Sequence, residues 1–333
     1  MRILVTGGAG YIGSVVAAEL LKAGHTVVVL DNLVHGHRQA VPSAAELVVG
    51  DVCDRAALDA VLATHAFDAV MHFAALVKVG ESLVSPERFF QNNSDGTRTL
   101  LEAMLVRGIK RMVFVSTAAV YGEPLAVPIP EDAPLRPVNP YGESKLLAER
   151  LLEEFGRRHG LHYATLRLFN AAGATLGCGE DHYPTTHLIP RVLAAAAGIA
   201  ESVRVFGTDY PTPDGTCIRD YVHILDLAAA HLLCLQALEH EERLVYNLGS
   251  GRGFSVREVI AAAENVTQRR IAVTEAERRP GDPAMLVASS AAIISQLGWA
   301  PRSSALERII ADAWRWYQKF PHGFGADEQR AAG

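Results

Sequence analysis

Cysteine is scarce in this chain of 333 residues, which has four cysteines and no CxxC pair. They are scattered, at positions 53, 178, 217 and 234. This spacing fits neither a disulfide framework nor a zinc site, so we expect no bound metal and a location in the reducing cytoplasm. Only Met1 and Arg2 precede the first apolar run, and no apolar run is long enough for a bilayer. We therefore expect neither a signal peptide nor a membrane partner.

Long basic stretches are also missing. Lysine and arginine together number 31, against 37 aspartate and glutamate residues, and the formal charge is −6. Without a run of positive charge that could follow phosphates, nucleic acid is not an expected partner. A histidine-based hydrolase is not expected either, because no metal-ligand motif or serine elbow includes His72, His182, His187 or His223.

Apolar strands alternate with amphipathic segments through the first half of the chain, which predicts an α/β fold with a doubly wound parallel Rossmann sheet. After residue 170, glycine, proline and histidine become frequent, as is typical of long binding loops. We expect a Rossmann domain of residues 1–170 plus about 220–250, and a smaller C-terminal lobe of residues 171–219 and 251–333. The predicted strands are 2–7, 25–31, 45–51, 66–75, 110–117, 163–170 and 243–250, and the predicted helices include 14–24, 86–107 and 141–159.

The segment VTGGAGYIG places Gly7, Gly10 and Gly13 in a GxxGxxG pattern at the first strand-to-helix turn. Glycines let the loop turn sharply and approach a pyrophosphate, while the following helix directs its free N–H groups at the phosphates. Asp31 ends the second strand at roughly the expected offset of about 20 residues. Together these features predict dinucleotide binding.

Asp31 also predicts which dinucleotide is bound. A carboxylate there accepts hydrogen bonds from a ribose 2′-OH and repels a 2′-phosphate, and the next residue is Asn32, not an arginine. NAD is therefore favoured over NADP. Asp51 closes the third strand, where it could receive an adenine amino group or cap the loop.

The tripeptide YGE occurs twice, at residues 121–123 and 141–143. A tyrosine that transfers a proton near neutral pH must lower its pKa from about 10 to about 7, which requires about 4 kcal/mol of preferential phenolate stabilisation. Tyr141 has Lys145 four residues later on a predicted helix, so that the ammonium can lie beside the phenol. Tyr121 has Leu125 at the same spacing, and prolines at 124 and 128 rule out a helix there. We expect Tyr141 to be the acid–base residue and Tyr121 to shape the pocket wall.

A hydroxyl that orients a substrate alcohol is expected next to Tyr141. Ser116 and Thr117 stand at the carboxyl end of the fifth strand, the edge at which ligands bind in such sheets.

The segments TGGAGYIGS, LDNL, YGESK, LRLFNAAGA, GEDH, DYPTPDGTCIRDY and RRPGD follow one another along nearly the whole chain. In these motifs the chain resembles the extended short-chain dehydrogenase/reductase family, and within it the enzymes that epimerise nucleotide sugars. The resemblance implies inversion of C4 of a UDP-hexose, UDP-galactose to UDP-glucose, by tightly bound NAD through a transient 4-keto sugar. Tyr141, Lys145 and Thr117 would be the catalytic residues, and the smaller lobe would bind the nucleotide-sugar.

The resemblance also implies binding roles, position by position. Arg219 and Arg279 match arginines that hold the diphosphate, and Phe206 and Asp282 match the uridine pocket. The other implied substrate contacts are Thr117, Tyr141, Asn170, His187, Leu188 and Leu286. Besides the glycine loop, Asp31, Asn32 and Asp51, the implied cofactor contacts are Tyr11, Ile12, Val52, Phe73, Ala74, Ala75, Asn92, Thr117, Tyr141, Lys145 and Phe169.

Some positions depart from the family pattern. Lys78 lies one place beyond a cofactor-contacting lysine of the family, and Val77 occupies that place, so no contact is assigned. His187 stands where some members have a substrate-binding asparagine. Leu286 stands where some members have a tyrosine, and a smaller residue there accompanies acceptance of N-acetylated sugars. We therefore hypothesise turnover of UDP-GalNAc and UDP-GlcNAc.

Three alternatives stay open to different degrees. A 4,6-dehydratase would need an acid–base pair after Thr117, where Ala118 and Ala119 follow instead. A UDP-glucuronate 4-epimerase is not separated by sequence. A non-catalytic NAD-binding regulator would be expected to lose the pair of Tyr141 and Lys145, which this chain keeps. By resemblance, a homodimer is expected through helices near 92–107 and 141–159.

Overall fold

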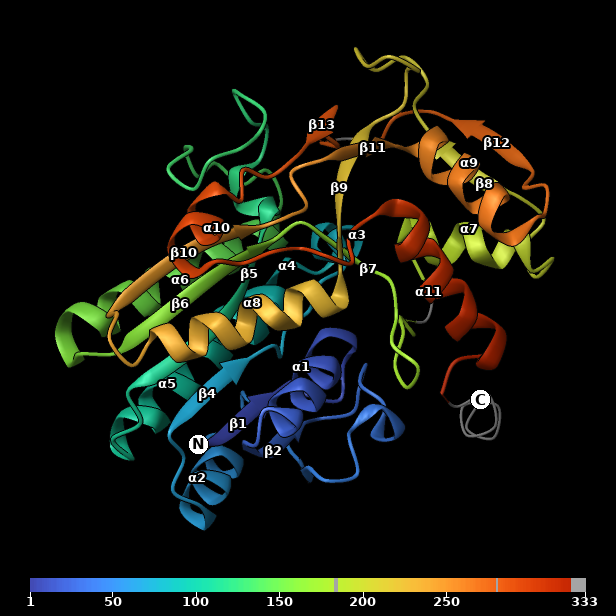
Figure 1. The fold of residues 1–333 in the computed structure, drawn as a ribbon. Helices are drawn as coiled ribbons and strands as arrows, with labels where there is room; N and C mark the ends of the chain where they lie inside the picture. Colours follow the sequence, from blue (N-terminus) through green and yellow to red (C-terminus); the bar gives the residue numbers. More distant parts are fainter. Residues whose placement is uncertain (183–184, 280, 325–333) are drawn as a thin grey trace.

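A parallel sheet of seven strands forms the centre of the larger part of the molecule (Figure 1). The computed structural model describes residues 1–182, 185–279 and 281–324. The strand order is β3-β2-β1-β4-β5-β6-β10, and every pairing in it is parallel. The chain moves outward from β1 to β3 and then returns to β4, so the order reverses between β1 and β4, where α/β sheets bind their ligands. The strands are β1 (Arg2–Thr6), β2 (Thr26–Asp31), β3 (Glu46–Val49), β4 (Ala69–His72), β5 (Arg111–Thr117), β6 (His162–Leu168) and β10 (Arg243–Leu248).

Helices cover both faces of this sheet (Figure 1). Alternate side chains of β1 enter opposite cores: Ile3 and Val5 pack toward α1 and α8, and Leu4 packs toward α2, α5 and α6. The strands are apolar on both faces because both faces are covered. The predicted doubly wound Rossmann sheet is confirmed. The covering helices are α1 (Tyr11–Lys22), α8 (Ile224–Ala237), α2 (Arg55–Thr64), α5 (Gly96–Val106) and α6 (Pro140–His159).

Two predicted helices differ in detail from the structure. The helix expected at 86–107 consists of α4 (Pro86–Phe89), the π-helix η2 (Phe90–Asp95) and α5. The helix expected at 14–24 begins at Tyr11, directly after the glycine loop. α6 begins close to the expected position because the Asn139 side chain caps it by accepting the Gly142 N–H at 2.9 Å.

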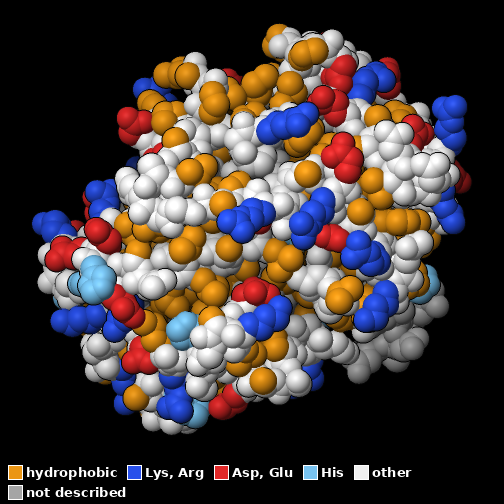
Figure 2. Space-filling model, in the orientation of Figure 1, with side chains coloured by type: hydrophobic (Ala, Val, Ile, Leu, Met, Phe, Trp, Pro, Cys, Tyr) orange, Lys and Arg blue, Asp and Glu red, His pale blue; other side chains and the backbone are white. Residues whose placement is uncertain are grey.

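The smaller part of the molecule contains short strands and three longer helices around a core of its own. Acidic and basic side chains are interspersed on the face shown in Figure 2. The four cysteines are free thiols. None of the helices in the described ranges has the length and apolar character needed to span a membrane. The remaining elements are α3 (Val79–Val84), β7 (Asn170–Ala172), α7 (Leu188–Ala196), β8 (Val203–Phe206), β9 (Ile218–His223), β11 (Gly253–Ser255), α9 (Val256–Thr267), β12 (Val273–Ala276), β13 (Met285–Leu286), α10 (Ala291–Leu297), α11 (Leu306–Lys319) and the 3-10 turns η1 (Arg38–Ala40) and η3 (Ala118–Tyr121).

A buried carboxylate on β9 ties the two parts together. Asp220 accepts hydrogen bonds from the N–H and hydroxyl of Ser250, at 2.7 and 2.6 Å, and from the N–H groups of Gly251 and Ala288, at 3.0 and 3.1 Å. These donors lie just after β10 of the large sheet and just after β13. Asp220 is fully buried, so its four hydrogen bonds replace hydration that water can no longer supply.

We predict that Asp220→Ala lowers the free energy of unfolding by about 3 kcal/mol or more, because several buried donors lose their acceptor at once. Urea denaturation measures this change. The control is Asp59→Ala, since Asp59 pairs with Arg55 at 3.0 Å on the exposed surface and such a pair contributes less than about 1 kcal/mol. Equal effects of the two substitutions would contradict the role of Asp220.

Candidate active site

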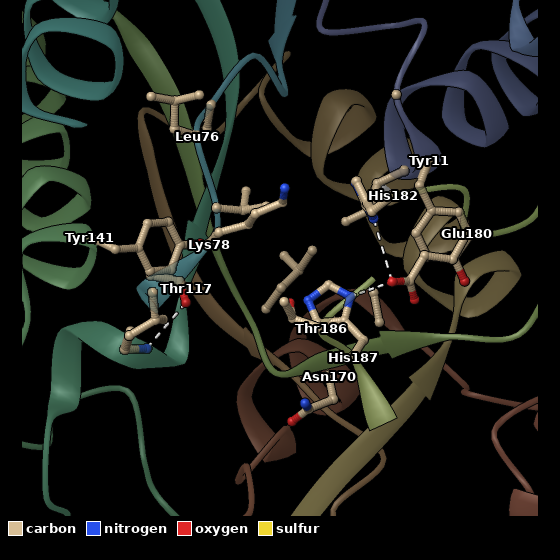
Figure 3. Close-up of a pocket in the computed structure, with 18 of the residues that line it drawn as sticks. Tyr11, Leu76, Lys78, Thr117, Tyr141, Asn170, Glu180, His182, Thr186 and His187 are labelled. Atoms are coloured by element: carbon tan, nitrogen blue, oxygen red, sulfur yellow. Dashed lines mark hydrogen bonds and ion pairs between the residues drawn. The ribbon is translucent and has the colours of Figure 1, made fainter. Parts of the chain in front are cut away.

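A cavity of about 1320 Å³ opens at the carboxyl edge of the parallel strands. All the candidate catalytic, cofactor-binding and substrate-binding residues named from the sequence line this cavity. Figure 3 shows Tyr141 and Thr117 on one side of it, with Glu180, His182 and His187 on the other and Asn170 below them. The structure therefore brings the candidates together, while their individual roles stay predictions.

Close backbone packing makes glycine necessary in the loop between β1 and α1 and in the first turn of α1. A Cβ atom on Gly13 would lie 2.3 Å from the Gly7 carbonyl oxygen, and one on Gly7, whose φ is +70°, would lie 2.4 Å from the Ala74 nitrogen. No side chain caps the start of α1. Its first N–H groups are therefore available to an anion at the cavity edge.

Asp31 and Asp51 lie beside this loop in different environments. The Asp31 carboxylate accepts the N–H groups of Ala9 and Leu33, at 3.0 and 2.9 Å, and burial raises its pKa. Burial also opposes ionisation of Asp51, but hydrogen bonds from the Cys53 N–H and the Asn32 amide outweigh it and lower the pKa. Asp51 thus caps its loop and also lines the cavity.

This end of the cavity fits NAD. The glycine loop and the uncapped start of α1 line the cavity where a pyrophosphate would be held, and Asp31 lines it where a ribose diol would be held. Asn92 reaches the cavity from the π-helix η2, a distortion of the kind often found at functional sites.

The proposed catalytic residues come from α6 and the end of β5. The Thr117 side chain lies beside the Tyr141 phenol, whose pKa it acts to lower, and its hydroxyl accepts the Ala119 N–H at 3.2 Å. Lys145 is buried one helical turn after Tyr141, with its Nζ 4.2 Å from the centre of the Phe114 ring. The Ser116 hydroxyl donates instead to Glu149, which leaves Thr117 as the hydroxyl that contacts Tyr141.

Burial is the largest cause of the pKa shifts of Tyr141 and Lys145. It raises the pKa of Tyr141 above its ordinary value, against the effect of the Thr117 hydrogen bond. It also lowers the pKa of Lys145 to about 7, although Glu149 acts in the opposite direction. That Lys145 lowers the pKa of Tyr141 stays a prediction, because burial sets the direction of both shifts. Burial disfavours the phenolate, and the lysine is itself only partly charged near neutral pH.

Tyr121 is a packing residue and does not belong to the residues that line the cavity. Its ring is 1% exposed, its hydroxyl donates to Asn247 Oδ1 at 2.7 Å, and it accepts from Arg167 Nη1 at 2.8 Å. The prediction that Tyr121 shapes the pocket wall is wrong, because these buried partners hold it in the core.

The end of the cavity that we expect to hold the substrate contains two arginines with different partners. Arg219, on β9, forms an ion pair with Asp282, and its Nη1 donates to the Ile218 carbonyl at 2.8 Å. The Arg279 guanidinium lies over the Phe206 ring, 3.9 Å from its centre. These cationic and aromatic groups can receive a phosphate group and a flat heterocycle.

Opposite Tyr141, the sequence prediction missed a cluster around Glu180. Both His187 and His182 direct Nδ1 at Glu180 Oε1, the latter at 3.4 Å (Figure 3). Their potential ligand atoms lie within 4.8 Å of one another, and Glu and His are types that bind divalent metals. The only sequence signal is the spacing ExHxxxxH in a loop, which matches no metal-ligand pattern with a known mechanism.

The charges of this cluster stabilise one another. Burial alone would raise the pKa of Glu180, but the imidazoles of His187 and His182 outweigh it and lower the pKa to about 2. The Glu180 carboxylate in turn raises the pKa of His187. Lys78 also lines the cavity, where its ammonium pairs with Glu81 at 3.0 Å.

A Rossmann sheet, a glycine loop and a tyrosine–lysine pair at one cavity define a dinucleotide-dependent enzyme of the short-chain dehydrogenase type. Residues 3–249 match the pattern of the NAD dependent epimerase/dehydratase family. The chain belongs to this family.

Several known proteins are similar over nearly the whole chain. The UDP-glucose 4-epimerase of Halalkalibacterium halodurans is 48% identical over 332 residues, which cover 99% of both chains. A crystal structure of UDP-glucose 4-epimerase superposes with a TM-score of 0.95 at 47% identity, covering 97% of this chain and 99% of the other. The Brucella ovis enzyme in complex with NAD has a TM-score of 0.91 at 44% identity, with 94% and 97% covered. The Bifidobacterium longum enzyme with NAD+ and UDP has a TM-score of 0.93 at 37% identity, with 97% and 100% covered.

The Glu180 cluster predicts a pH-dependent stability. Because the pKa of His187 is raised, its contribution is complete below about pH 6.5 and is lost as pH rises through the raised value. Because the pKa of Glu180 is lowered to about 2, its contribution is complete above about pH 4.5 and is lost as pH falls toward that lowered value. The melting temperature of Glu180→Gln should therefore fall furthest below that of the parent between about pH 4.5 and 6.5, and less at alkaline pH.

Thermal unfolding over a pH series measures this difference. Glu46→Gln is the matched control, since Glu46 pairs with His65 at 3.0 Å on the surface and should contribute little at any pH. A deficit of Glu180→Gln that does not change with pH would contradict the ion pair.

Proposed function

We propose that the chain uses NAD to invert C4 of a UDP-hexose, interconverting UDP-galactose and UDP-glucose, and that it is an isomerase. The observation that carries this proposal is the contact of Tyr141 with Thr117, with Lys145 one turn away, in a cavity that joins the glycine loop to the two arginines. The near full-length similarity to UDP-glucose 4-epimerases supports the same reaction.

Side chains of the protein transfer the proton of the sugar hydroxyl. Tyr141 takes the proton of the 4-OH and later returns it, while the Thr117 hydroxyl holds the sugar oxygen and the phenol in line. The Lys145 ammonium supplies the positive charge that a phenolate needs in this buried place. NAD, which the glycine loop and Asp31 would hold, would supply the acceptor and later the donor of the C4 hydride.

Inversion also requires the sugar to present its other face while its nucleotide stays bound. We assign the diphosphate to Arg219 and Arg279, and the uridine to the side of Phe206 and Asp282. Asn170, His187, Leu188 and Leu286 would surround the hexose. In this arrangement residues 1–170 with about 220–250 hold the cofactor, and residues 171–219 with 251–333 hold the UDP-sugar.

We further infer a homodimer in the cytoplasm. Leu105 and Val106 expose apolar side chains at the end of α5, 43% and 69% accessible, and α5 packs against α6. A second copy that covers these helices would bury this apolar surface.

The geometry of the site gives less support to the alternative functions. Ala118 and Ala119 provide no acid–base groups beside Thr117, as a dehydratase would need. A non-catalytic regulator would not need the contact between Thr117 and Tyr141. A UDP-glucuronate 4-epimerase shares the same catalytic groups, and substrate profiling separates it.

The direct test is to incubate the purified protein with UDP-galactose and no added NAD. UDP-glucose should appear until equilibrium, and Tyr141→Phe should lower kcat by about 10² to 10⁴-fold because the general base is lost. Tyr121→Phe is the matched control from the second YGE and should keep most of the activity. No conversion by protein that contains NAD would overturn the proposed function.

Leu286 gives a second prediction, on substrate range. Leu286 is partly buried in the cavity wall and is smaller than tyrosine, so UDP-GalNAc and UDP-GlcNAc should also be interconverted. Leu286→Tyr should reduce this activity by at least about tenfold relative to UDP-galactose, because it fills the space of the N-acetyl group. Comparison of kcat/KM for the two sugar pairs is the measurement. Normal UDP-galactose turnover without any N-acetyl turnover in the parent chain would reject the idea.

A further inference from the structure

Behind Tyr141 and Lys145 lies a buried ion pair that the reaction described above does not use. Arg167 on β6 donates to Glu149 on α6, from Nη2 to Oε2 at 2.8 Å and from Nε to Oε1 at 3.1 Å. The two side chains are 6% and 9% exposed. Removing two charges from water is costly, and such a pair often contributes no more stability than apolar residues would. Stability alone therefore does not explain why this ion pair is buried, and its position beside Tyr141 and Lys145 points to a role in the site.

Glu149 is connected to both sides of the catalytic pair. Tyr141, Lys145 and Glu149 follow one another at intervals of four residues and lie on one face of α6. The Glu149 carboxylate also accepts the Ser116 hydroxyl at 2.5 Å, and Ser116 directly precedes Thr117 on β5. The Glu149 carboxylate thus lies one helical turn after Lys145. Through Ser116 it also holds the end of β5, which carries the Thr117 hydroxyl.

The surroundings of Lys145 are otherwise poor in negative charge. The Phe114 ring of β5 lies beneath its ammonium, and His72 of β4 is buried between the hydroxyls of Thr6 and Thr97. Burial and the nearby Lys145 lower the pKa of His72 to about 3, so this imidazole is neutral. Among the described residues, Glu149 is the acidic group that acts on Lys145 and favours its charged form.

We propose that Glu149 is a positioning residue for the reaction: it keeps the Lys145 ammonium charged and fixes the end of β5 at Thr117. This inference rests on the proposed function. Arg167 orients the carboxylate with its planar fork, and its remaining Nη1 is held by the Tyr121 hydroxyl and the Glu131 carbonyl, at 2.8 and 2.9 Å. Tyr121, the other YGE tyrosine, therefore lies three contacts away from the proposed chemistry.

The charge of Lys145 can be observed without any turnover. The ammonium signal of Lys145, assigned with Lys145→Arg, is titrated by NMR in ¹⁵N-lysine-labelled protein saturated with NAD. In Glu149→Gln the titration midpoint of Lys145 should fall by about one pH unit or more, because an opposite charge close by shifts a pKa by about 1 to 3. In the same variant the alkaline limb of kcat for UDP-galactose should move to lower pH by the same amount.

Two further variants make the test specific. Glu131→Gln is the matched control, since Glu131 accepts the Asn247 N–H at 3.0 Å at the far end of the same network and should leave the Lys145 titration unchanged. Glu149→Gln leaves Arg167 without its partner, which can unfold the protein. The double variant Glu149→Gln with Arg167→Gln restores neutrality and should fold while keeping a lowered Lys145 midpoint.

Each possible result either supports or contradicts the role of Glu149. An unchanged Lys145 midpoint in both Glu149 variants, or an equal fall in Glu131→Gln, overturns the proposal. A uniform loss of kcat at all pH values with an unchanged midpoint shows a merely structural role and overturns it too. If the parent protein turns over no UDP-galactose, the proposed function fails, while the NMR titration still decides whether Glu149 sets the charge of Lys145.

Discussion

The parallel register of β1, β4 and β5 is the constraint on which the rest of the site depends. Thr6 lies opposite His72 and His72 lies opposite Phe114, so the residues that follow leave the sheet at one edge. Gly7 and Thr117 therefore reach the same cavity although 109 intervening residues separate them. Because parallel strands end together, the sheet itself brings together the predicted phosphate-binding turn and the strand end with the predicted catalytic hydroxyl.

Burial then creates the electrostatic problem of the site. The wall that excludes water also raises the pKa of Tyr141 and lowers that of Lys145, so that both groups favour their neutral forms. A proton-abstracting tyrosine needs the opposite. The Glu149 carboxylate favours the charged form of Lys145, and the Thr117 hydroxyl favours the phenolate of Tyr141. Both interactions are stronger because the buried site has a low dielectric constant.

Local patterns in the sequence predicted the parts of the site that local structure determines. The glycine loop, Asp31 at a strand end and the four-residue spacing of Tyr141 and Lys145 each need only one strand or helix to form. The fate of Tyr121 could not be predicted this way, because its partners Arg167 and Asn247 come from β6 and β10. The π-helix η2 was missed because its sequence, FQNNSD, has a single apolar residue and so no apolar spacing that could tell it from an α-helix.

The residues that we expect to bind the substrate were still harder to predict from local sequence patterns. Arg219 lies on β9, Phe206 ends β8, and Asp282 and His187 lie in loops, so no periodicity links them and only motif resemblance could group them. Their common position depends on how β9 is joined to the large sheet. Asp220 follows Arg219 directly and binds the turn after β10, so the residue that anchors the smaller part stands next to an arginine of the cavity. Arg219, which we assign to the diphosphate, is therefore anchored to the Rossmann sheet through its neighbour Asp220, while Thr117 is placed by the sheet register and by the hydrogen bond from Ser116 to Glu149.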